Sequence, residues 1–402
     1  MHRFRNSRVS DVKIDWPALK DILADAGYAS RPVGVLFADH FHANAESLVK
    51  RLKKASTLRS NIRTNTGTNA GLSPTVRVAS KSLRIRKALD AALQTPGFAG
   101  ILGFTLAEAV WLAEKGYQDI VVAYPSVNAE AIAAWTASEA ALQHVTLMVD
   151  DPQQLEIIAH LAPGHPDLKV AIELDAAYRP VRGVMVGAAR SPLSSPEEVA
   201  RLAAHIVGRK GFTLDGLMAY EGQIAGEANA GSSPRQVILR RIQAASAKEI
   251  AQRRAETVDA VSEIAPLRFV NGGGTGSIET TGTEAAITEV AAGSGLIGPG
   301  LFDHYTAFKP APALAFGMDV VRRPNKNTAT VLGGAGSPPG RPVQAGYRGS
   351  RGHPTSPTAQ LKVPVKCRPR SPDEALAALQ SAMSCGFGTR KPAKYRNAST
   401  AL

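Results

Sequence analysis

Residues 100–124, GILGFTLAEAVWLAEKGYQDIVVAY, carry the pattern that decides the fold of this 402-residue chain. The stretch begins with an apolar run (100–104) and ends with another, which follows Asp119 (120–124). Between them, after Thr105, apolar residues recur three and four positions apart. Short apolar runs are typical of buried strands, whereas this spacing after a capping residue is typical of an amphipathic helix. The stretch therefore predicts a strand, a helix and a second strand.

The same unit recurs from residue 76 to about 295. The β-rich runs are Val76–Ser80, Gly100–Phe104, Asp119–Tyr124, Val145–Asp150, Leu168–Asp175, Leu214–Glu221, Arg268–Gly274 and Thr288–Gly295. Helical patterns such as DPQQLEIIAHL (151–161) and SPEEVARLAAHIVG (195–208) separate most of them. A doubly wound open sheet would show this alternation with fewer strands, so the count favours an α/β fold of the (β/α)₈ barrel type.

The flanking segments suggest how the rest of the chain is organised. We expect an N-terminal extension (1–32), a barrel segment (33–310) that opens with a strand at 33–38 and a helix near 43–54, and the start of a β-domain (311–334). Residues 56–73 are polar and turn-rich and predict a loop. FGMDVVRRPNKNTATVLGG (316–334) predicts two strands and a turn.

Composition narrows the class of protein. Apolar residues make up 44% of the chain, which excludes disorder of the whole chain. The sequence contains no run of eighteen apolar residues, so it does not indicate a membrane span. The N-terminus has no apolar segment typical of a secretory signal, and two cysteines are too few for a disulfide framework. We therefore expect a cytoplasmic protein that does not act on membranes.

The net charge of +13 comes mainly from the last part of the chain. Residues 335–402 hold eleven Lys and Arg against two Asp and Glu, and they include nine prolines. The preceding residues hold 36 basic and 32 acidic side chains. Because the excess positive charge belongs to this tail, which composition alone describes as disordered, we do not expect nucleic acid as a partner.

Lys81 lies at the end of the predicted barrel where functional residues are usually found. The first barrel strand ends in VRVASKSLR (76–84), which places Lys81 at the carboxyl end of that strand, the functional end of such barrels. A lysine that forms a Schiff base needs a desolvated amine with a lowered pKa near other cations. The alternative is a solvated lysine beside Arg84 and Arg86.

A glycine turn lies at the end of the seventh strand, in VNGGGTGS (270–277). Its bare backbone N–H groups and its hydroxyl side chains are suited to a phosphate, and barrels commonly bind phosphate near strands seven and eight. A plain turn is the alternative. A lysine after strand one and a phosphate cradle after strand seven together suggest pyridoxal phosphate, held at both ends.

Several stretches resemble one family of pyridoxal-phosphate proteins. They are FADHFHANAESL (37–48), VRVASKSLR (76–84), VAIELDAAYRPVRGV (170–184), LDGLMAYEGQI (214–224), FVNGGGTGS (269–277) and EVAAGSGLIGPGLFD (289–303). In this order they resemble proteins with an alanine-racemase-type N-terminal barrel (fold type III). The similarity is greatest to the D-threonine aldolase and D-serine dehydratase branch, often named amino acid deaminase/aldolase.

The resemblance implies the site residues. Lys81 would form the Schiff base with the cofactor, and Gly273, Gly274, Thr275 and Gly276 would hold its phosphate. Tyr220, with Glu221 and Gly222, would be the catalytic tyrosine stretch after strand six.

Other positions are less clearly assigned. Many relatives carry His where this chain has Gln223, which leaves the acid/base group on that side open. Asp175 and Arg182 match an acidic strand end and an arginine that precedes glycine, and both a cofactor contact and a salt bridge at the barrel rim remain open for them. We interpret His40 and His42 as structural.

The resemblance also implies a reaction. The family's lyases act on D-3-hydroxy amino acids, either by aldol cleavage to glycine and an aldehyde or by dehydration and deamination to a keto acid and ammonia. A divalent metal in their C-terminal domain assists, and they are usually homodimers. An amino acid racemase, or a cofactor-binding barrel without turnover, is the alternative.

The tail lacks the C-terminal motifs that the family predicts. When Gly333–Ser350 is back-translated and read in the next frame, permitted codons give WRGLASGPPGSSRLPWL, and Ala382–Thr400 gives DVVWFRHAETGEISERFN. Both resemble family motifs, so we interpret 335–402 as the product of a frameshift near 333–335. The metal site would then be lost, and His353, Cys367 and Cys385 would be no ligands.

Overall fold

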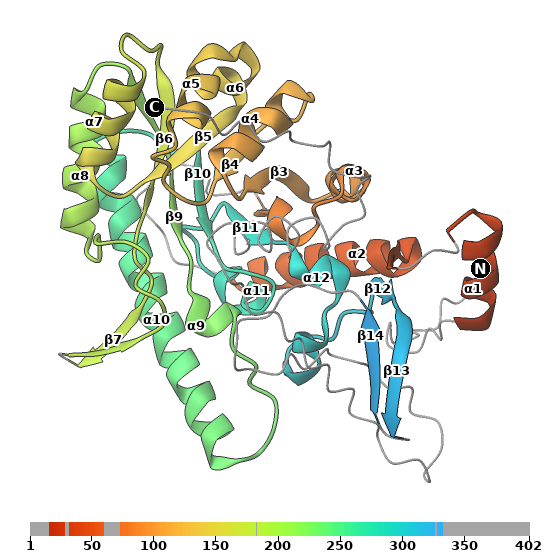
Figure 1. The fold of residues 1–402 in the computed structure, drawn as a ribbon. Coiled ribbons are helices and arrows are strands. Elements are labelled where there is room, and N and C mark those ends of the chain that lie inside the picture. The colour runs from red at the N-terminus through yellow and green to blue at the C-terminus, as the bar shows by residue number, and fades with distance from the viewer. Residues whose placement is uncertain (1–15, 29–31, 60–72, 182, 326–327, 333–402) are drawn as a thin grey trace, which may run out of the picture. The chain divides into compact units, whose positions relative to one another are not determined.

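The computed structural model describes residues 16–28, 32–59, 73–181, 183–325 and 328–332 (Figure 1). These residues fall into two compact units. One runs from Phe37 to Ala313, and the other combines the described residues of Val12–Leu36 with those of Leu314–Leu402. The predicted tail (335–402), most of the predicted loop at 56–73 and Arg182 lie outside the described residues.

Eight parallel strands of the first unit close into a barrel in the order β10-β11-β2-β3-β4-β5-β6-β9. The strands are β2 (Thr75–Ala79), β3 (Phe98–Gly103), β4 (Ile120–Val122), β5 (Val145–Val149), β6 (Leu168–Glu173), β9 (Phe212–Ala219), β10 (Phe269–Gly272) and β11 (Glu289–Ala292). Each overlaps one of the runs predicted from the sequence. The (β/α)₈ barrel is therefore confirmed.

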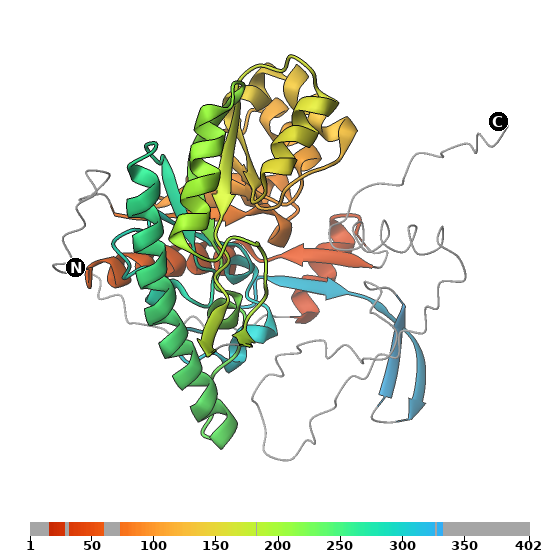
Figure 2. The same cartoon turned by 90° about the vertical axis from the view of Figure 1, so that its left-hand side faces the viewer.

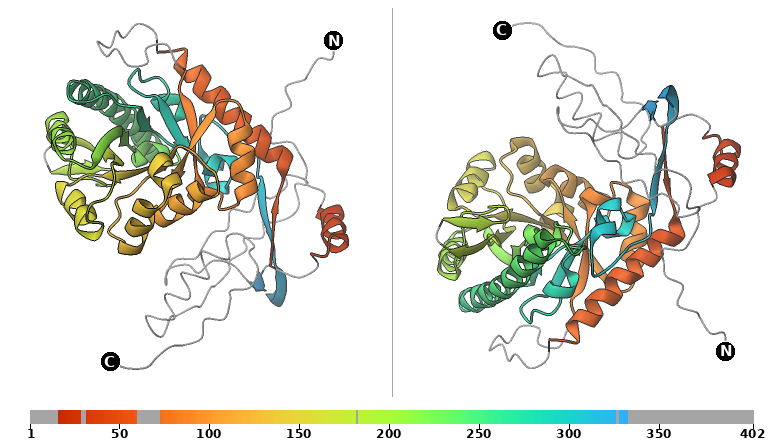
Figure 3. Two further views of the ribbon diagram at one scale, coloured as in Figure 1. Left: turned by 90° about the horizontal axis from the view of Figure 1, so that it is seen from above. Right: turned by 90° about the horizontal axis from the view of Figure 1, so that it is seen from below.

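Helices surround the strands, as the views in Figure 3 show. They are α2 (Ala38–Ser56), α3 (Arg86–Gln94), α4 (Leu106–Glu114), α5 (Ala129–Ala137), α6 (Glu139–His144), α7 (Pro152–Leu161), α8 (Pro196–Gly208) and α10 (Pro234–Ser262). Asp151 and Ser195 form capping boxes at α7 and α8, each followed by a proline at the start of the helix. The long helix α10 lies beside α8 (Figure 2).

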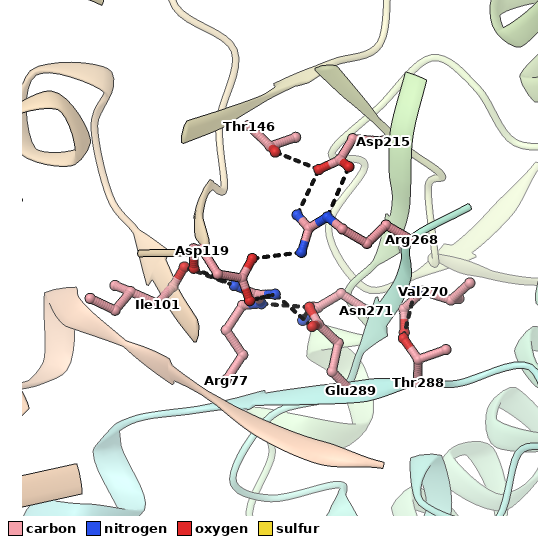
Figure 4. Close-up of polar contacts among 10 residues, drawn as sticks. All are labelled: Arg77, Ile101, Asp119, Thr146, Asp215, Arg268, Val270, Asn271, Thr288 and Glu289. Carbon is pink, nitrogen blue, oxygen red and sulfur yellow. Dashed lines mark hydrogen bonds and ion pairs between the residues drawn. The ribbon is translucent and has the colours of Figure 1, made fainter. Parts of the chain in front are cut away.

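Ion pairs fill the barrel near the amino ends of its strands (Figure 4). The Arg77 guanidinium, 1% exposed, donates to both carboxylate oxygens of Glu289 at 2.6 and 2.7 Å and to the Asp119 carboxylate at 2.9 Å. Arg268 joins Asp119 at 2.7 Å to Asp215 at 2.6 Å. Each buried charge therefore has an opposite partner, as burial requires.

The next layer of the interior is apolar, and four of its nine residues are alanine. Because strand side chains alternate, residues two positions after the charged layer also point inward. This layer contains Ala79, Leu102, Val121, Ala123, Met148, Ala171, Met218, Phe269 and Ala291. The alanines leave the carboxyl end of the barrel unfilled, and the cavity described below lies there.

The second unit is mostly antiparallel. Strand β1 (Val33–Leu36) pairs with β12 (Leu314–Gly317), so the strand predicted at 33–38 pairs outside the barrel. Strands β13 (Asp319–Asn325) and β14 (Thr328–Leu332) form a two-stranded sheet, as the sequence pattern at 316–334 predicts. Helix α1 spans Trp16–Asp25. None of the helices in the described parts of the chain is both long and apolar enough to cross a membrane.

Candidate functional site at the barrel mouth

A cavity of about 220 Å³ opens at the carboxyl ends of the barrel strands. Its floor is the apolar layer of the barrel interior, with Ala79, Ala123, Met218 and Ala291 among its lining. Lys81, Tyr124, Arg190, Tyr220 and the turn after β10 form its polar wall. Functional sites of such barrels lie at this end, so the cavity is the candidate site.

Lys81 lines the cavity from a short 3₁₀ turn (Ser80–Ser82) that directly follows β2. The N–H groups of Leu83 and Arg84 both donate to the carbonyl oxygen of Ser80 and close this turn. Lys81 is exposed to solvent. It is therefore accessible to a ligand that enters the cavity.

The glycine turn after β10 presents two unused backbone donors. The Gly273 N–H donates to Glu221 Oε2 at 3.1 Å and the Gly274 N–H to Ser277 Oγ at 3.1 Å. The N–H groups of Thr275 and Gly276 have no acceptor within the described part of the chain. Of the predicted phosphate cradle at residues 273–276, the first half thus supports the turn, and the first three residues line the cavity whereas Gly276 does not.

A second pair of backbone donors faces the same cavity after β11. Gly293 and Ser294, at the start of helix α12 (Ser294–Ile297), line it, and their N–H groups find no acceptor in the described ranges. The Gly295 N–H donates to Thr275 Oγ1 at 3.1 Å and ties the two turns together. The stretch at 289–303 contains GSG at 293–295 and resembles the family, but the sequence alone assigned this pair no role.

Tyr220 lines the cavity after β9, as predicted, whereas Gln223 does not. Burial, aided by the nearby charge of Glu221, raises the pKa of the Tyr220 phenol. The Gln223 amide, in helix α9 (Gly222–Ala225), donates to the Ala176 carbonyl at 2.7 Å and to Ser246 Oγ at 2.9 Å. Its side chain therefore supports the loop after β6.

Asp175 is not among the cavity-lining residues. Its carboxylate, 0% exposed, forms an ion pair with Arg179 and accepts the Arg190 N–H at 3.3 Å. Of the two roles left open for Asp175, these contacts correspond to the salt bridge, with Arg179 as partner. The antiparallel strands β7 (Tyr178–Val181) and β8 (Val184–Val186) flank Arg182.

Arg190 is a cavity residue that the sequence reasoning missed. Its Nε donates to Glu173 Oε1 at 2.5 Å, and its guanidinium carbon lies 4.9 Å from the Tyr124 ring centroid and 5.5 Å from that of Tyr220. Burial alone would lower the pKa of Arg190, but the bond to Glu173 outweighs it and raises the pKa. The available signal was GAARSPL (187–193), an arginine after the loop that follows β6.

Tyr124 lies between the two cations of the cavity. Lys81 Nζ is 5.8 Å from its ring centroid, and Arg190 Nη1 is 3.4 Å from its hydroxyl. Burial raises the pKa of this phenol, but Arg190 and Lys81 together overcome that effect and hold it below the ordinary value. The hydroxyl is thus placed to accept or donate a proton near Lys81.

The two histidines near the start of α2 lie apart from the cavity lining. His40 is buried, and its Nδ1 lies 2.7 Å from the Pro312 carbonyl oxygen. His42 borders a separate surface groove. Within the described ranges, no group of three or more His, Cys, Asp or Glu side chains is placed to hold a metal ion.

Solved structures with a similar fold come from several amino acid enzymes. D-threonine aldolase from Filomicrobium marinum superposes with a TM-score of 0.58 at 19% identity, over 74% of this chain and 71% of that one. D-threo-3-hydroxyaspartate dehydratase from Delftia sp. HT23 gives 0.52 at 19% identity, over 73% and 68%. An alanine racemase-like protein from Idiomarina loihiensis gives 0.51 at 17% identity, over 74% and 69%.

Neither a protein-family description nor a curated protein sequence matches the chain. At 17–19% identity the structural likeness establishes the fold. The chain therefore has the barrel fold of the proteins that its motifs resemble.

Proposed function

We propose that the barrel binds pyridoxal phosphate at Lys81 and acts as a lyase on D-3-hydroxy amino acids. The observation that carries the proposal is one cavity lined both by an accessible lysine, Lys81, and by Thr275, whose backbone N–H has no acceptor among the described residues. An aldehyde and a phosphate on one small molecule match these two features.

The donor set fits a phosphate. Backbone N–H groups without acceptors cost free energy when they are buried, and an anion satisfies them. The turns after β10 and β11 are the seventh and eighth strand ends, where barrels commonly bind phosphate. Arg190 adds a fixed positive charge that favours an anionic ligand.

The side chains of the cavity have separate tasks under this proposal. Lys81 would hold the cofactor through its amine, and the same amine would serve as the group that moves a proton at the substrate Cα. Tyr124 holds a proton beside that amine, and the buried Tyr220 phenol stays protonated as a hydrogen-bond donor. When bound, pyridoxal phosphate supplies an electron sink for the charge left by the breaking bond.

The names of the similar structures support the reaction class. They include an aldolase that acts on D-threonine and a dehydratase that acts on D-threo-3-hydroxyaspartate, both of them lyases of 3-hydroxy amino acids. We accordingly propose either cleavage of the Cα–Cβ bond to glycine and an aldehyde, or loss of the β-hydroxyl to give a keto acid and ammonia.

Product analysis tests the proposal. The protein with added pyridoxal phosphate is incubated separately with D-threonine and D-serine, and glycine, acetaldehyde, pyruvate and ammonia are measured. We expect one pair of products, lost in Lys81→Ala and kept in the control Lys87→Ala, a lysine of helix α3 that does not line the cavity. Bound cofactor without products would favour the barrel without turnover, and an L-amino acid product would favour a racemase.

A further inference from the structure

A buried carboxylate contacts the two ends of the glycine turn after β10. Glu221, 1% exposed, follows Tyr220 but does not line the cavity. Its Oε2 accepts the Gly273 N–H at 3.1 Å and an Arg254 N–H at 2.9 Å. The proposed function gives this carboxylate no task.

The other oxygen of Glu221 holds the far end of the turn. Oε1 accepts the Ser277 hydroxyl at 3.2 Å and the Thr281 hydroxyl of helix α11 (Ile278–Thr281). Ser277 Oγ in turn accepts the Gly274 N–H. One carboxylate thus fixes both ends of the turn from Gly273 to Ser277.

The backbone of the turn shows why such a clamp matters. Gly273 has φ +70°, a conformation that other residues rarely adopt. With the first two N–H groups drawn toward Glu221 and Ser277, the N–H groups of Thr275 and Gly276 are left without an acceptor among the residues described. A turn without the clamp would have several alternative conformations and would lose this arrangement.

Charge balance explains how a carboxylate is tolerated behind an anion site. Arg254, which lies in helix α10 and is 0% exposed, donates to Glu221 and to Glu284. Burial raises the pKa of the Glu284 carboxyl although Arg254 acts in the opposite direction. The positive charge of Arg254 lies beside the Glu221 carboxylate and offsets its repulsion of a phosphate.

We infer that Glu221 is a positioning residue, whose carboxylate holds the turn 273–277 in the conformation that binds the phosphate of the ligand. The inference rests on the proposed function for the identity of that ligand. Arg254 is the counter-ion of this carboxylate inside the protein.

Two leucine variants separate positioning from general stability. Glu221→Leu and Glu284→Leu each leave Arg254 with one carboxylate, but only the first removes contacts to the turn. We expect Glu221→Leu to lose at least about tenfold in affinity for pyridoxal phosphate and to keep its affinity for pyridoxal, which has no phosphate. Glu284→Leu should retain both affinities. Absorbance titration measures the affinities, and thermal unfolding measures the stability of each variant.

A conservative variant gives a second measure. In Glu221→Gln the amide oxygen still accepts the Gly273 N–H, and the Ser277 and Thr281 hydroxyls rotate to accept from the amide. We expect partial rescue, with a loss of only a few-fold for pyridoxal phosphate. If the leucine variant does not fold, a loss in Glu221→Gln restricted to pyridoxal phosphate supports the inference, and equal affinities overturn it.

The outcomes distinguish the inference from the proposed function. If Glu221→Leu binds pyridoxal phosphate as tightly as the unsubstituted protein, or if Glu284→Leu loses as much, the inference is wrong. If the unsubstituted protein binds no pyridoxal phosphate, the proposed function fails, and inorganic phosphate becomes the probe. Phosphate should then raise the unfolding temperature of the unsubstituted protein and not that of Glu221→Leu, and an equal rise in both overturns the inference.

Discussion

The substitution Gly276→Ala tests whether the turn after β10 binds the phosphate. A Cβ at this position would overlap the Ala225 carbonyl oxygen and lie 2.5 Å from Tyr305 Cε1. Neither neighbour moves freely, because the Tyr305 hydroxyl donates to that same carbonyl at 3.1 Å and both residues are buried. The turn itself must therefore shift and take its N–H groups with it.

The size of the effect follows from those N–H groups. A hydrogen bond to a charged group contributes about 1.5–3 kcal/mol, so losing one weakens cofactor binding roughly 10- to 150-fold. Overpacking the buried turn should also lower the free energy of unfolding by about 1–3 kcal/mol. The dissociation constant of pyridoxal phosphate is measured by absorbance titration, and stability by urea unfolding.

A matched substitution provides the control. Gly208→Ala, at the end of α8, places a methyl group where no atom lies within 4 Å. It should leave affinity unchanged and gain at most about 1 kcal/mol in stability. Unchanged pyridoxal phosphate affinity in Gly276→Ala would refute the assignment of the phosphate to this turn.

Three further predictions concern the charged groups of the barrel. Arg190→Met should raise the pKa of Tyr124, because the guanidinium that lowers it is lost; an ultraviolet tyrosinate titration measures this, with Tyr124→Phe to assign the signal, and an unchanged titration curve contradicts it. Arg77→Met should lower the free energy of unfolding by about 3–5 kcal/mol, since it leaves the buried Glu289 carboxylate without its ion-pair partner. A loss below about 1 kcal/mol in urea unfolding would show that the ion-pair network of the barrel is dispensable for stability. Burial raises the pKa of Glu284 above the reference value of 4.5, so its neutral form stabilises the fold below that pH, and this contribution is lost as pH rises through the folded-state pKa. Glu284→Gln should therefore gain stability relative to the unsubstituted protein as pH increases from 4.5 to 7. A difference in unfolding free energy that stays constant over this range would contradict the prediction.

The barrel was predictable because strand and helix patterns are local. In 100–124 the run, the cap at Thr105 and the apolar spacing each depend on neighbouring residues, and β3, α4 and β4 form within two residues of the predicted bounds. The partner of β1 was not predictable in this way. Its pairing with β12 joins segments nearly 280 residues apart, and no local pattern encodes that contact.

The site was predictable where a residue follows a strand directly. Lys81 and Tyr220 lie within two residues of a strand end, so placing the strand also places the side chain. Arg190 lies beyond the β7–β8 pair, and its position depends on the Asp175 and Glu173 contacts. The division of the turn at 273–276 into supporting and free N–H groups likewise depends on Glu221, which is distant in sequence.

Reductive labelling tests the central claim, that this barrel holds pyridoxal phosphate on Lys81, most directly. The protein is incubated with pyridoxal phosphate, reduced with borohydride and digested, and the modified peptide is identified by mass spectrometry. We predict one stoichiometric adduct on Lys81, absent in Lys81→Ala. An adduct on another lysine, or no adduct above that of the variant, would contradict the account.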